Sequence, residues 1–434
     1  MANESFDITV VGAGMVGASV ALSAARAGWQ VAVIEPAEPT PVTPDCAAEL
    51  RVSALSAGSE RWLRRLGVWD AMESQRMAPF RRLSVWEAPL GPLNAMQTLR
   101  RVSETARTTF DAANLERSHL GHIVENRVTQ HALWQALTRE PNITRFCPAT
   151  ITGLEHSSDG ASVELDDGTC LHSLLIVAAD GAGSPTRTLA GIGTSRDQYR
   201  QQAMVISITH ESPQQDITWQ MFTPEGPRAY LPLPVINGQC CGSLVWYDQP
   251  ERLDALMGLS ETGLMDAITR AFPAELPRLT GAPDRGRFPI ARSHAHEYVR
   301  GRVVLVGDAA HTINPLAGQG VNLGFQDAAC LSKLLLQARR HRQDPADPAL
   351  LNRYAHERRP RNALMMVAMD VFYMAFSNRQ PPVHLARTLG LGLAGRIPAA
   401  RDRVARYAMG IDEALPAPLA SLLQRFSGSP KEDA

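Results

Sequence analysis

The feature that most constrains the fold is a glycine-rich loop near the N-terminus. An apolar run at residues 8–11 leads directly into Gly12-Ala13-Gly14-Met15-Val16-Gly17. An alanine-rich stretch continues to Gly28, and a second apolar run occupies residues 30–35. This order predicts a strand, a helix and a second, parallel strand joined by a right-handed crossover. We therefore expect an α/β fold built around this unit.

The spacing of the glycines is typical of a dinucleotide site. Gly12 permits a tight turn, Gly14 lets backbone N–H groups approach a pyrophosphate, and Gly17 lets the helix pack closely on the strand. Glu35 ends the second strand, where a carboxylate accepts a hydrogen bond from a ribose hydroxyl. The later match at residues 390–395 has no strand before it and no acid after it in register. We expect a nucleotide at the first loop and none at the later one.

Two further loops follow apolar runs that predict buried strands. Asp180-Gly181-Ala182-Gly183-Ser184-Pro185-Thr186-Arg187, taken alone, predicts a turn and the start of a helix. The third loop begins at Gly307 and places Asp308 at the carboxyl end of a strand, where open α/β sheets bind ligands. It continues through Pro315-Leu316-Ala317-Gly318-Gln319-Gly320-Val321-Asn322, which presents glycine amides at a helix N-terminus and favours a negative charge there.

Composition excludes several classes of protein. With 434 residues, the chain exceeds one typical core and predicts two domains. Lys and Arg number 43 against 44 Asp and Glu, so we expect no nucleic-acid partner, since phosphate binding needs a positive field. The six cysteines form no CxxC or Cys/His spacing, which favours free thiols, a reducing cytoplasm and no metal site. No signal peptide and no membrane span are expected.

The middle of the chain has a different pattern. Apolar and polar residues alternate from about 204 to 248, with turn residues at 224–227 and 237–238. This pattern predicts an antiparallel sheet. Residues 50–70 and 126–140 are expected to be helical. Because a glycine loop and helix return after residue 302, we expect a nucleotide-binding domain that the sheet interrupts.

The three loops, in this order, resemble the single-component flavin monooxygenases that hydroxylate aromatic rings, the group related to p-hydroxybenzoate hydroxylase. Within that group the chain is similar to the ubiquinone-biosynthesis hydroxylases. The stretches that carry this resemblance are residues 51–56, 124–127, 220 with 222, 226–227 with 231–233, 307–324 and 376–378. Others are most similar to the members that hydroxylate demethoxyubiquinol, namely residues 67–71, 81–83, 134–137, 218–220 and 244–248.

The resemblance implies a Rossmann-like, glutathione-reductase-type domain that binds FAD. Its three parts would be residues 1–75, 106–187 and 287–345. The antiparallel substrate domain would comprise residues 76–105 and 188–286, and a helical, basic region would follow at residues 346–434. NADH or NADPH would bind transiently as co-substrate and O₂ would react at the flavin. The substrate would be the ring of a polyprenylated quinol.

The resemblance also assigns cofactor contacts. Gly12, Gly14, Gly17 and Glu35 would hold the ADP part of FAD. Arg51 and Arg127 would contact the phosphates or the ribityl chain, although Arg51 could be a surface salt-bridge partner and Arg127 a solvated helix residue. Asp180 would serve the pyrophosphate and the passing NAD(P)H, and Asp308 the ribityl hydroxyls. The residues against the flavin ring would be Pro315, Gly318, Gly320, Val321 and Asn322.

Catalytic residues are less well defined by the sequence. Period-two alternation places Gln220 and Phe222 on one face of a strand and Trp219 on the other, and we expect the first pair to face the substrate. Ordinary sheet packing is the alternative. His311 follows Asp308 closely and could act as a base or hold the loop by a hydrogen bond.

The C-terminal segment from 379 to 407 contains six arginines and one aspartate. Such a segment can bind an anionic membrane surface or a partner, such as another ubiquinone-biosynthesis protein, although a solvated helix face is the alternative. We expect a cytoplasmic protein, peripheral on the inner face of the membrane. The alternative functions are a related hydroxylase acting on another ring position or phenol, a reductase or cyclase of the geranylgeranyl-reductase type, and a non-catalytic FAD-binding protein.

Overall fold

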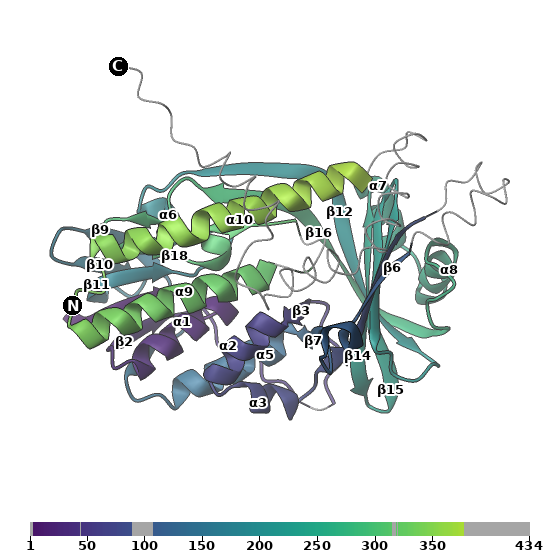
Figure 1. The fold of residues 1–434 in the computed structure, drawn as a ribbon, viewed down its shortest axis with the longest axis horizontal. Coiled ribbons are helices and arrows are strands. Elements are labelled where there is room, and N and C mark those ends of the chain that lie inside the picture. Colours follow the sequence, from purple (N-terminus) through teal and green to yellow (C-terminus); the bar gives the residue numbers. More distant parts are fainter. Residues whose placement is uncertain (1–2, 44, 89–106, 315–317, 319, 377–434) are drawn as a thin grey trace, which may run out of the picture.

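The computed structural model describes residues 3–43, 45–88, 107–314, 318 and 320–376 (Figure 1). Two large sheets lie at opposite ends of the molecule, and α10 (Pro348–Phe376) runs along one side of both (Figure 1). None of the described helices combines the length and the apolar composition that crossing a bilayer requires. The basic segment from 379 to 407 and the glycine pattern at 390–395 lie outside the described residues.

The first sheet has a parallel centre. Its spatial order is β17-β18-β11-β1-β2-β8, and β10 and β9 extend it antiparallel from β11. The eight strands are β1 (Asn3–Val11), β2 (Val31–Ile34), β8 (Ile143–Phe146), β9 (Ile151–His156), β10 (Ala161–Leu165), β11 (Cys170–Ala178), β17 (Val299–Arg300) and β18 (Val303–Leu305). The predicted parallel pairing of the first two strands is confirmed.

Three helices pack together on this sheet. They are α1 (Met15–Arg26), α5 (Asn126–Thr138) and α9 (Gly320–His341), with α1 in contact with both others. The predicted helix over residues 126–140 is confirmed, and its apolar side, which includes Val128, Leu133 and Leu137, is buried. Alanines on α1 allow it to pack closely, because most of them are fully buried.

The second sheet has eight strands in the order β19-β16-β12-β15-β14-β13-β5-β6. They are β5 (Arg82–Glu87), β6 (Thr108–Asp111), β12 (Thr194–His210), β13 (Ile217–Thr223), β14 (Gly226–Ile236), β15 (Gln239–Asp248), β16 (Leu279–Ala295) and β19 (His311–Thr312). The antiparallel sheet predicted for residues 204–248 is confirmed, including its two turns.

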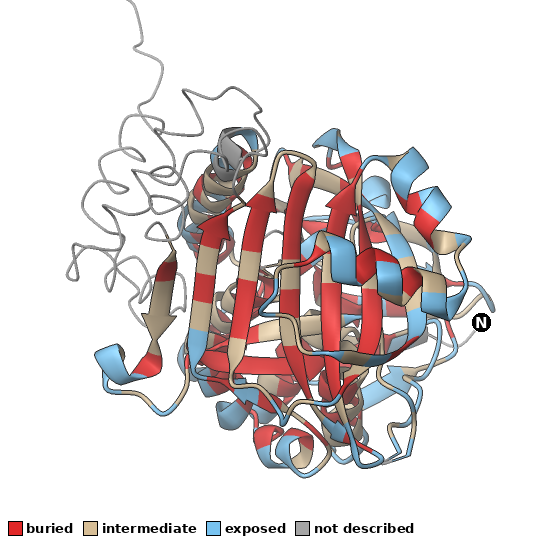
Figure 2. Ribbon diagram, turned by 90° about the vertical axis from the view of Figure 1, so that its right-hand side faces the viewer, coloured by how far each residue is buried: buried red, intermediate tan, exposed pale blue. Residues whose placement is uncertain are grey.

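One face of the second sheet is covered by α7 (Pro250–Met257) and α8 (Glu261–Ala271), and Figure 2 looks onto it, with buried strand segments behind exposed helices. The long strands β12 and β16 run from this sheet toward the first. The expected domain boundary between residues 286 and 287 falls inside β16, and the other boundaries remain predictions.

A small third sheet corrects one prediction. Residues 50–70 were expected to be helical, but β3 (Val52–Ser56) precedes α2 (Ala57–Arg65), and α3 (Trp69–Glu73) follows. β3 pairs with β7 (Gly121–Glu125), which also pairs with β4 (Ala78–Phe80). The helical expectation was wrong for residues 52–56, because pairing with a distant strand decides the conformation of a segment with weak local preference. The remaining short elements are η2 (Ala112–Leu115), α6 (Pro185–Leu189) and η3 (Gly307–Ala309).

Candidate functional site

The three predicted loops leave the same edge of the first sheet, side by side. The Ala179 N–H donates to the Val11 carbonyl at 2.8 Å, and the Val306 N–H donates to the Ala178 carbonyl at 3.0 Å. The carboxyl ends of β1, β11 and β18 are therefore adjacent. Gly12 has a φ of +95°, and a Cβ there would come within 2.5 Å of the Ala179 carbonyl oxygen, so this turn requires glycine.

The first loop leaves its helix N-terminus open. Gly14 is the N-cap of α1, no side chain caps it, and no acidic residue lies in the first turn. A Cβ built at Gly14 would meet nothing within 4 Å. The Glu35 carboxylate accepts a hydrogen bond from the Ala13 N–H at 2.5 Å. This bond lowers the pKa of Glu35, but the effect of burial is larger, and the pKa is raised. This arrangement offers uncapped amides and open space to an anionic ligand.

The second loop has the turn and helix start that its residues alone predict. The Asp180 carboxylate accepts from the Ser184 hydroxyl and, at 2.9 Å, from the Thr186 N–H. Open space lies beside Gly181 and Gly183. The buried Arg187 donates to the Ala309 carbonyl at 2.8 Å and thereby ties this loop to the third.

The third loop carries the acidic side chain of Asp308, which is exposed to solvent although protein surrounds much of it. Desolvation by the surrounding protein raises the pKa of its carboxyl, with His311 and Arg51 acting in the opposite direction. Arg51 is itself exposed, and its guanidinium lies 5.7 Å from the centroid of the Phe288 ring. Arg51, predicted to contact the phosphates or the ribityl chain, therefore interacts electrostatically with Asp308, which is predicted to bind the ribityl hydroxyls.

Arg127 has a different setting. It donates to the Ala47 carbonyl and, at 2.9 Å, to the Glu125 carboxylate. Glu125 also binds the buried Arg76, with a Nε–Oε2 distance of 2.6 Å. Arg127 thus belongs to a packed ionic cluster at the end of β7, and its contact with a cofactor remains a prediction.

His311 is buried beneath the third loop. Its Nε2 lies 2.5 Å from the Asp327 carboxylate, which also accepts from the Arg358 Nε at 2.7 Å, from Asn362 at 3.0 Å and from the Gly307 N–H at 3.2 Å. This network holds the backbone that carries Asp308. The geometry favours the loop-holding interpretation of His311, and its action as a base remains a prediction.

The helix that follows the third loop is fixed by Asn322. Its side-chain oxygen accepts from the Ser56 N–H at 2.9 Å and from the Ser59 hydroxyl at 2.7 Å, while its Nδ2 donates to the Ala54 carbonyl at 2.9 Å. Asn322 is fully buried and links α9 to β3 and α2, and its predicted place against the flavin ring remains a prediction. Four neighbouring residues were also predicted to contact the flavin ring. A Cβ at Gly318 would lie 3.5 Å from the Ala54 side chain, and Gly320 and Val321 are the first residues of α9. Pro315 lies outside the described residues.

The two faces of the second sheet differ in what covers them. Trp219, Tyr230 and Trp246 pack with the residues of α7 and α8 in one buried cluster. Phe222 lies in a separate cluster that includes Tyr247, whose hydroxyl donates to the Asn314 side chain at 3.4 Å.

The Phe222 face is thus the one near the third loop. The half-buried Gln220 shares it by strand alternation. The substrate contacts of both residues remain predictions.

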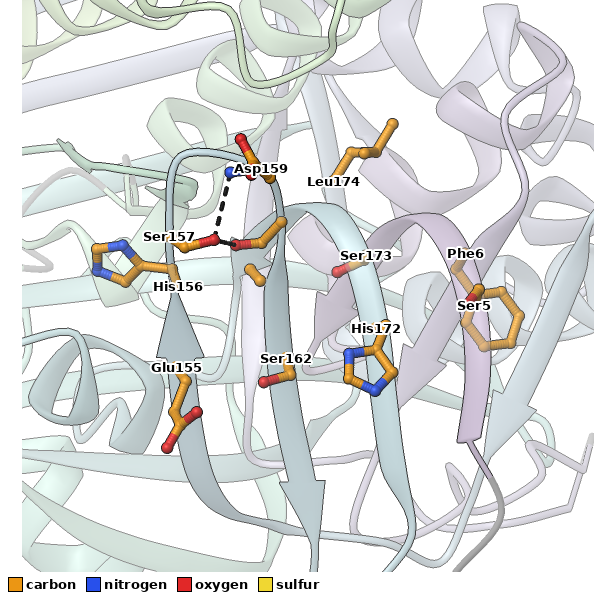
Figure 3. A pocket seen from close by; sticks show the side chains of 12 residues that line it. Ser5, Phe6, Glu155, His156, Ser157, Asp159, Ser162, His172, Ser173 and Leu174 are labelled. Atoms are coloured by element: carbon orange, nitrogen blue, oxygen red, sulfur yellow. Dashed lines mark hydrogen bonds between the residues drawn. The ribbon is translucent and has the colours of Figure 1, made fainter.

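A hollow of about 420 Å³ lies elsewhere, on the first sheet (Figure 3). Its walls include Phe6 of β1, Ser162 of β10 and His172 of β11. Because Phe6 and His172 belong to the amino-terminal halves of parallel strands, this hollow is away from the edge where the three loops meet. The position of the loops, and not the size of this hollow, indicates the site.

Comparison with known proteins agrees with this geometry. A family model described as "FAD binding domain" matches residues 5–368. This chain belongs to the FAD binding domain family, and its cofactor is FAD. It is 43% identical over 411 residues to the 3-demethoxyubiquinol 3-hydroxylase of Escherichia coli, covering 95% of this chain and all of that protein. The ubiquinone hydroxylase UbiL of Rhodospirillum rubrum is 33% identical, with 94% of this chain and 90% of that protein covered.

Solved structures show the same fold. A p-nitrophenol 4-monooxygenase from Pseudomonas putida aligns with a TM-score of 0.73 at 17% identity, covering 95% of this chain and all of that one. HpxO from Klebsiella pneumoniae, complexed with FAD, aligns with a TM-score of 0.68 at 20% identity, covering 94% and 99%.

The residues present fit FAD. Open space lies beside Gly14, and the uncapped N-terminus of α1 offers N–H donors of the kind that bind a pyrophosphate. Glu35 and Asp308 are carboxylates that accept from hydroxyl groups. This edge of the first sheet thus offers a backbone cradle and two acidic acceptors, which suit the pyrophosphate and the hydroxyl groups of FAD; the individual contacts remain predictions.

Sequence reasoning missed the residues that support the third loop. Asp327, Arg358 and Asn362 are buried and hold His311, but nothing in their separation along the chain indicates contact. One signal was available. Asp327 lies four residues after Leu323 and four before Leu331, on the apolar stripe of a predicted helix, where a carboxylate must have buried partners.

Proposed function

We propose that this chain is an FAD-dependent monooxygenase that uses NAD(P)H and O₂ to hydroxylate the ring of demethoxyubiquinol. The observation that supports this most directly is the convergence of the three loops at one sheet edge, near the Phe222 face of the second sheet. The identity of 43% along nearly the whole chain to a 3-demethoxyubiquinol 3-hydroxylase supports the choice of substrate.

The residues of this chain bind and orient. FAD, when bound, supplies the hydride acceptance and the activation of O₂ that side chains lack. The amides of α1 would hold the pyrophosphate, Glu35 a ribose hydroxyl and Asp308 the ribityl hydroxyls. The buried Phe222 and Tyr247 exclude water from the apolar face, and this exclusion favours transfer of oxygen to substrate over its loss to solvent.

The test is product analysis with the purified, FAD-loaded protein. We expect NAD(P)H oxidation and O₂ uptake to depend on a short-chain demethoxyubiquinol, and the product to gain one oxygen atom by mass spectrometry. Turnover under anaerobic conditions would instead indicate a reductase or cyclase. In cells that lack the protein, accumulation of a different ubiquinone precursor would assign another ring position.

We also propose that the protein is cytoplasmic and binds peripherally to the inner face of the membrane, through residues 379–407. This segment has a net charge of +5, from six arginines and one aspartate, and positive charge near an anionic surface is worth about 1 kcal/mol per residue. The last turns of α10 carry exposed apolar side chains nearby in the sequence, namely Val367, Val371 and Met374. A polyprenylated substrate resides in the bilayer, so surface binding would give access to it.

Vesicle sedimentation tests this proposal. Full-length protein should bind vesicles with anionic headgroups, and truncation of residues 379–434 should remove most of this binding without reducing the FAD content. Equal binding of the truncated and full-length proteins would contradict the assignment. Neutral vesicles are the control, because they lack the charge that the arginines would recognise.

A further inference from the structure

A second cluster of polar side chains lies outside the three loops, on α2, on β7 and in the segment just before β7. Glu60 of α2, His119 before β7 and His122 on β7 each bring one metal-ligating atom within 4.8 Å of the other two. The side chains of Glu60 and His122 are largely buried, with 10% and 8% of their surface exposed. One carboxylate oxygen of Glu60 faces both rings, at 2.8 Å from His119 Nε2 and 3.7 Å from His122 Nδ1.

One nitrogen of this cluster has no hydrogen-bond partner. Among the described residues, His122 Nδ1 is a buried side-chain nitrogen with no hydrogen-bond partner, and the whole residue is 6% exposed. Leaving a buried polar atom unpaired costs about 1–3 kcal/mol. Because Nδ1 lies near the shared Glu60 oxygen, a cation between them would satisfy the nitrogen.

The neighbours of the cluster already orient its ligands. His119 Nδ1 lies 2.8 Å from the Ser118 hydroxyl, which fixes the ring while Nε2 points at Glu60. His122 packs edge-on against Trp69, with ring centroids 4.9 Å apart. A hydrogen bond to the second ring nitrogen, like that of Ser118 to His119, orients the ring of a metal-binding histidine.

We propose that Glu60, His119 and His122 form a binding site for a divalent metal ion of the zinc class. Two imidazoles and a carboxylate are a zinc ligand set that leaves a fourth position for water. Imidazole ligands favour zinc and its transition-metal neighbours over Mg²⁺ and Ca²⁺, which prefer oxygen. With bonds of about 2.0–2.1 Å, ligand atoms around tetrahedral zinc lie roughly 3.3 Å apart, so modest side-chain movements close the site.

A nearby cation limits the affinity without blocking the site. Arg64 Nε binds the other carboxylate oxygen of Glu60 at 2.9 Å, and its guanidinium lies 5.0 Å from the centroid of the Trp69 ring. The Glu60 oxygen that faces the histidines is not the one that Arg64 binds. Since Ser59, next to Glu60, binds Asn322, an ion here would brace the helix that supports the FAD-binding loop.

The test is zinc binding by the full-length, FAD-loaded protein after treatment with a chelator. Calorimetric titration with Zn²⁺ should give one ion per chain at this site, and Mg²⁺ should not compete. Glu60→Gln and His119→Asn should each weaken zinc binding at least tenfold. Co²⁺ in place of zinc should give the absorption bands of a tetrahedral ion.

The matched control replaces a glutamate and a histidine at a site away from the cluster. The double variant Glu155→Gln with His156→Asn lies at the exposed hollow of Figure 3 and should bind zinc as wild type does. FAD absorbance and circular dichroism check that each variant is folded. Unchanged zinc affinity in folded Glu60→Gln, or no zinc binding by wild type, would overturn the proposal.

A measurement on wild type alone covers the case in which the variants do not fold. Diethyl pyrocarbonate modifies accessible imidazoles, and His119 is partly exposed. Zn²⁺ should protect His119 from this reagent and leave exposed histidines such as His172 reactive. Equal modification of His119 with and without zinc would overturn the site. Neither readout depends on hydroxylase activity, so failure here would not affect the proposed function.

Discussion

Two of the three glycine loops, those that precede α1 and α9, differ in how the residues around them are held. The loop before α1 is open: Gly14 caps the helix without a side-chain partner, and space surrounds it. The N-terminal part of α9 is instead clasped by side chains: Asn322 forms hydrogen bonds with Ser56, Ser59 and Ala54, and Asp327, farther along the helix, binds four groups. The first loop follows β1, and the segment that begins at Gly307 follows β18 of the same sheet.

The difference shows how binding and support are divided. The loop before α1 can bind a ligand through its backbone N–H groups without help from side chains. The loop that carries Asp308 needs buried side chains beneath it, because they fix the position of Asp308. Changes in the clasped unit should therefore cost folding stability first. Changes in the open unit should reduce FAD binding while the folded chain persists.

The largest effect is expected for Asp327→Asn. This change leaves the buried Arg358 guanidinium without its counter-charge, which costs about 3–5 kcal/mol in comparable buried pairs. Urea unfolding of the apoprotein measures the loss. Asp254→Asn is the control, since Asp254 is largely exposed and its partner Arg287 partly so, and surface pairs contribute about 0–1 kcal/mol.

The same pair makes a pH prediction. Burial opposes ionisation of Asp327, but His311 and Arg358 outweigh it and lower the pKa of that carboxyl. A lowered folded-state pKa gives stability above the ordinary carboxyl pKa of about 3.9 that is lost as the pH falls below it. Asp327→Asn should therefore flatten the acid limb of the stability profile. An unchanged acid limb would contradict the charge network.

A smaller loss of stability is expected for Gly17→Ala in the open unit. A Cβ at Gly17 would overlap the Gly12 carbonyl oxygen and come within 2.8 Å of the Ala179 side chain. Overpacking of this kind costs about 1–3 kcal/mol. Gly14→Ala is the matched control, because its Cβ enters open space and should leave apoprotein unfolding unchanged while weakening FAD binding. Equal destabilisation by both changes would remove the distinction between the two glycines.

How far the sequence predicts these two units depends on where the information lies. The open unit is local: strand, glycines, helix and Glu35 lie within one continuous stretch, so periodicity and spacing predict it. The antiparallel sheet was likewise predictable, because Pro224, Gly226, Asn237 and Gly238 are residue types that turns favour, and the two turns lie at or next to them.

The clasped unit depends on contacts between distant segments. β3 was missed because Ser53 pairs with Val124 and the local sequence resembles a helix start. Asn322 could be placed near the flavin from the motif, but its bonds to Ser56 and Ser59 required the fold. Spacing along the chain carries no signal for such pairs. Asp327 is an exception, because a charged residue on the apolar side of a predicted helix indicates that it has buried partners, although not which ones.

The smallest change in folding is expected for Asp308→Asn, which separates the function of the third loop from its support. Asp308 is exposed, so apoprotein stability should change by less than about 0.5 kcal/mol. FAD should bind at least tenfold more weakly, because a hydrogen bond to a charged group is worth about 1.5–3 kcal/mol and 1.4 kcal/mol is a factor of ten. Flavin fluorescence titration of the apoprotein measures the affinity. If FAD affinity were unchanged, Asp308 would not contact the ribityl chain, and the clasp beneath it would serve the fold alone.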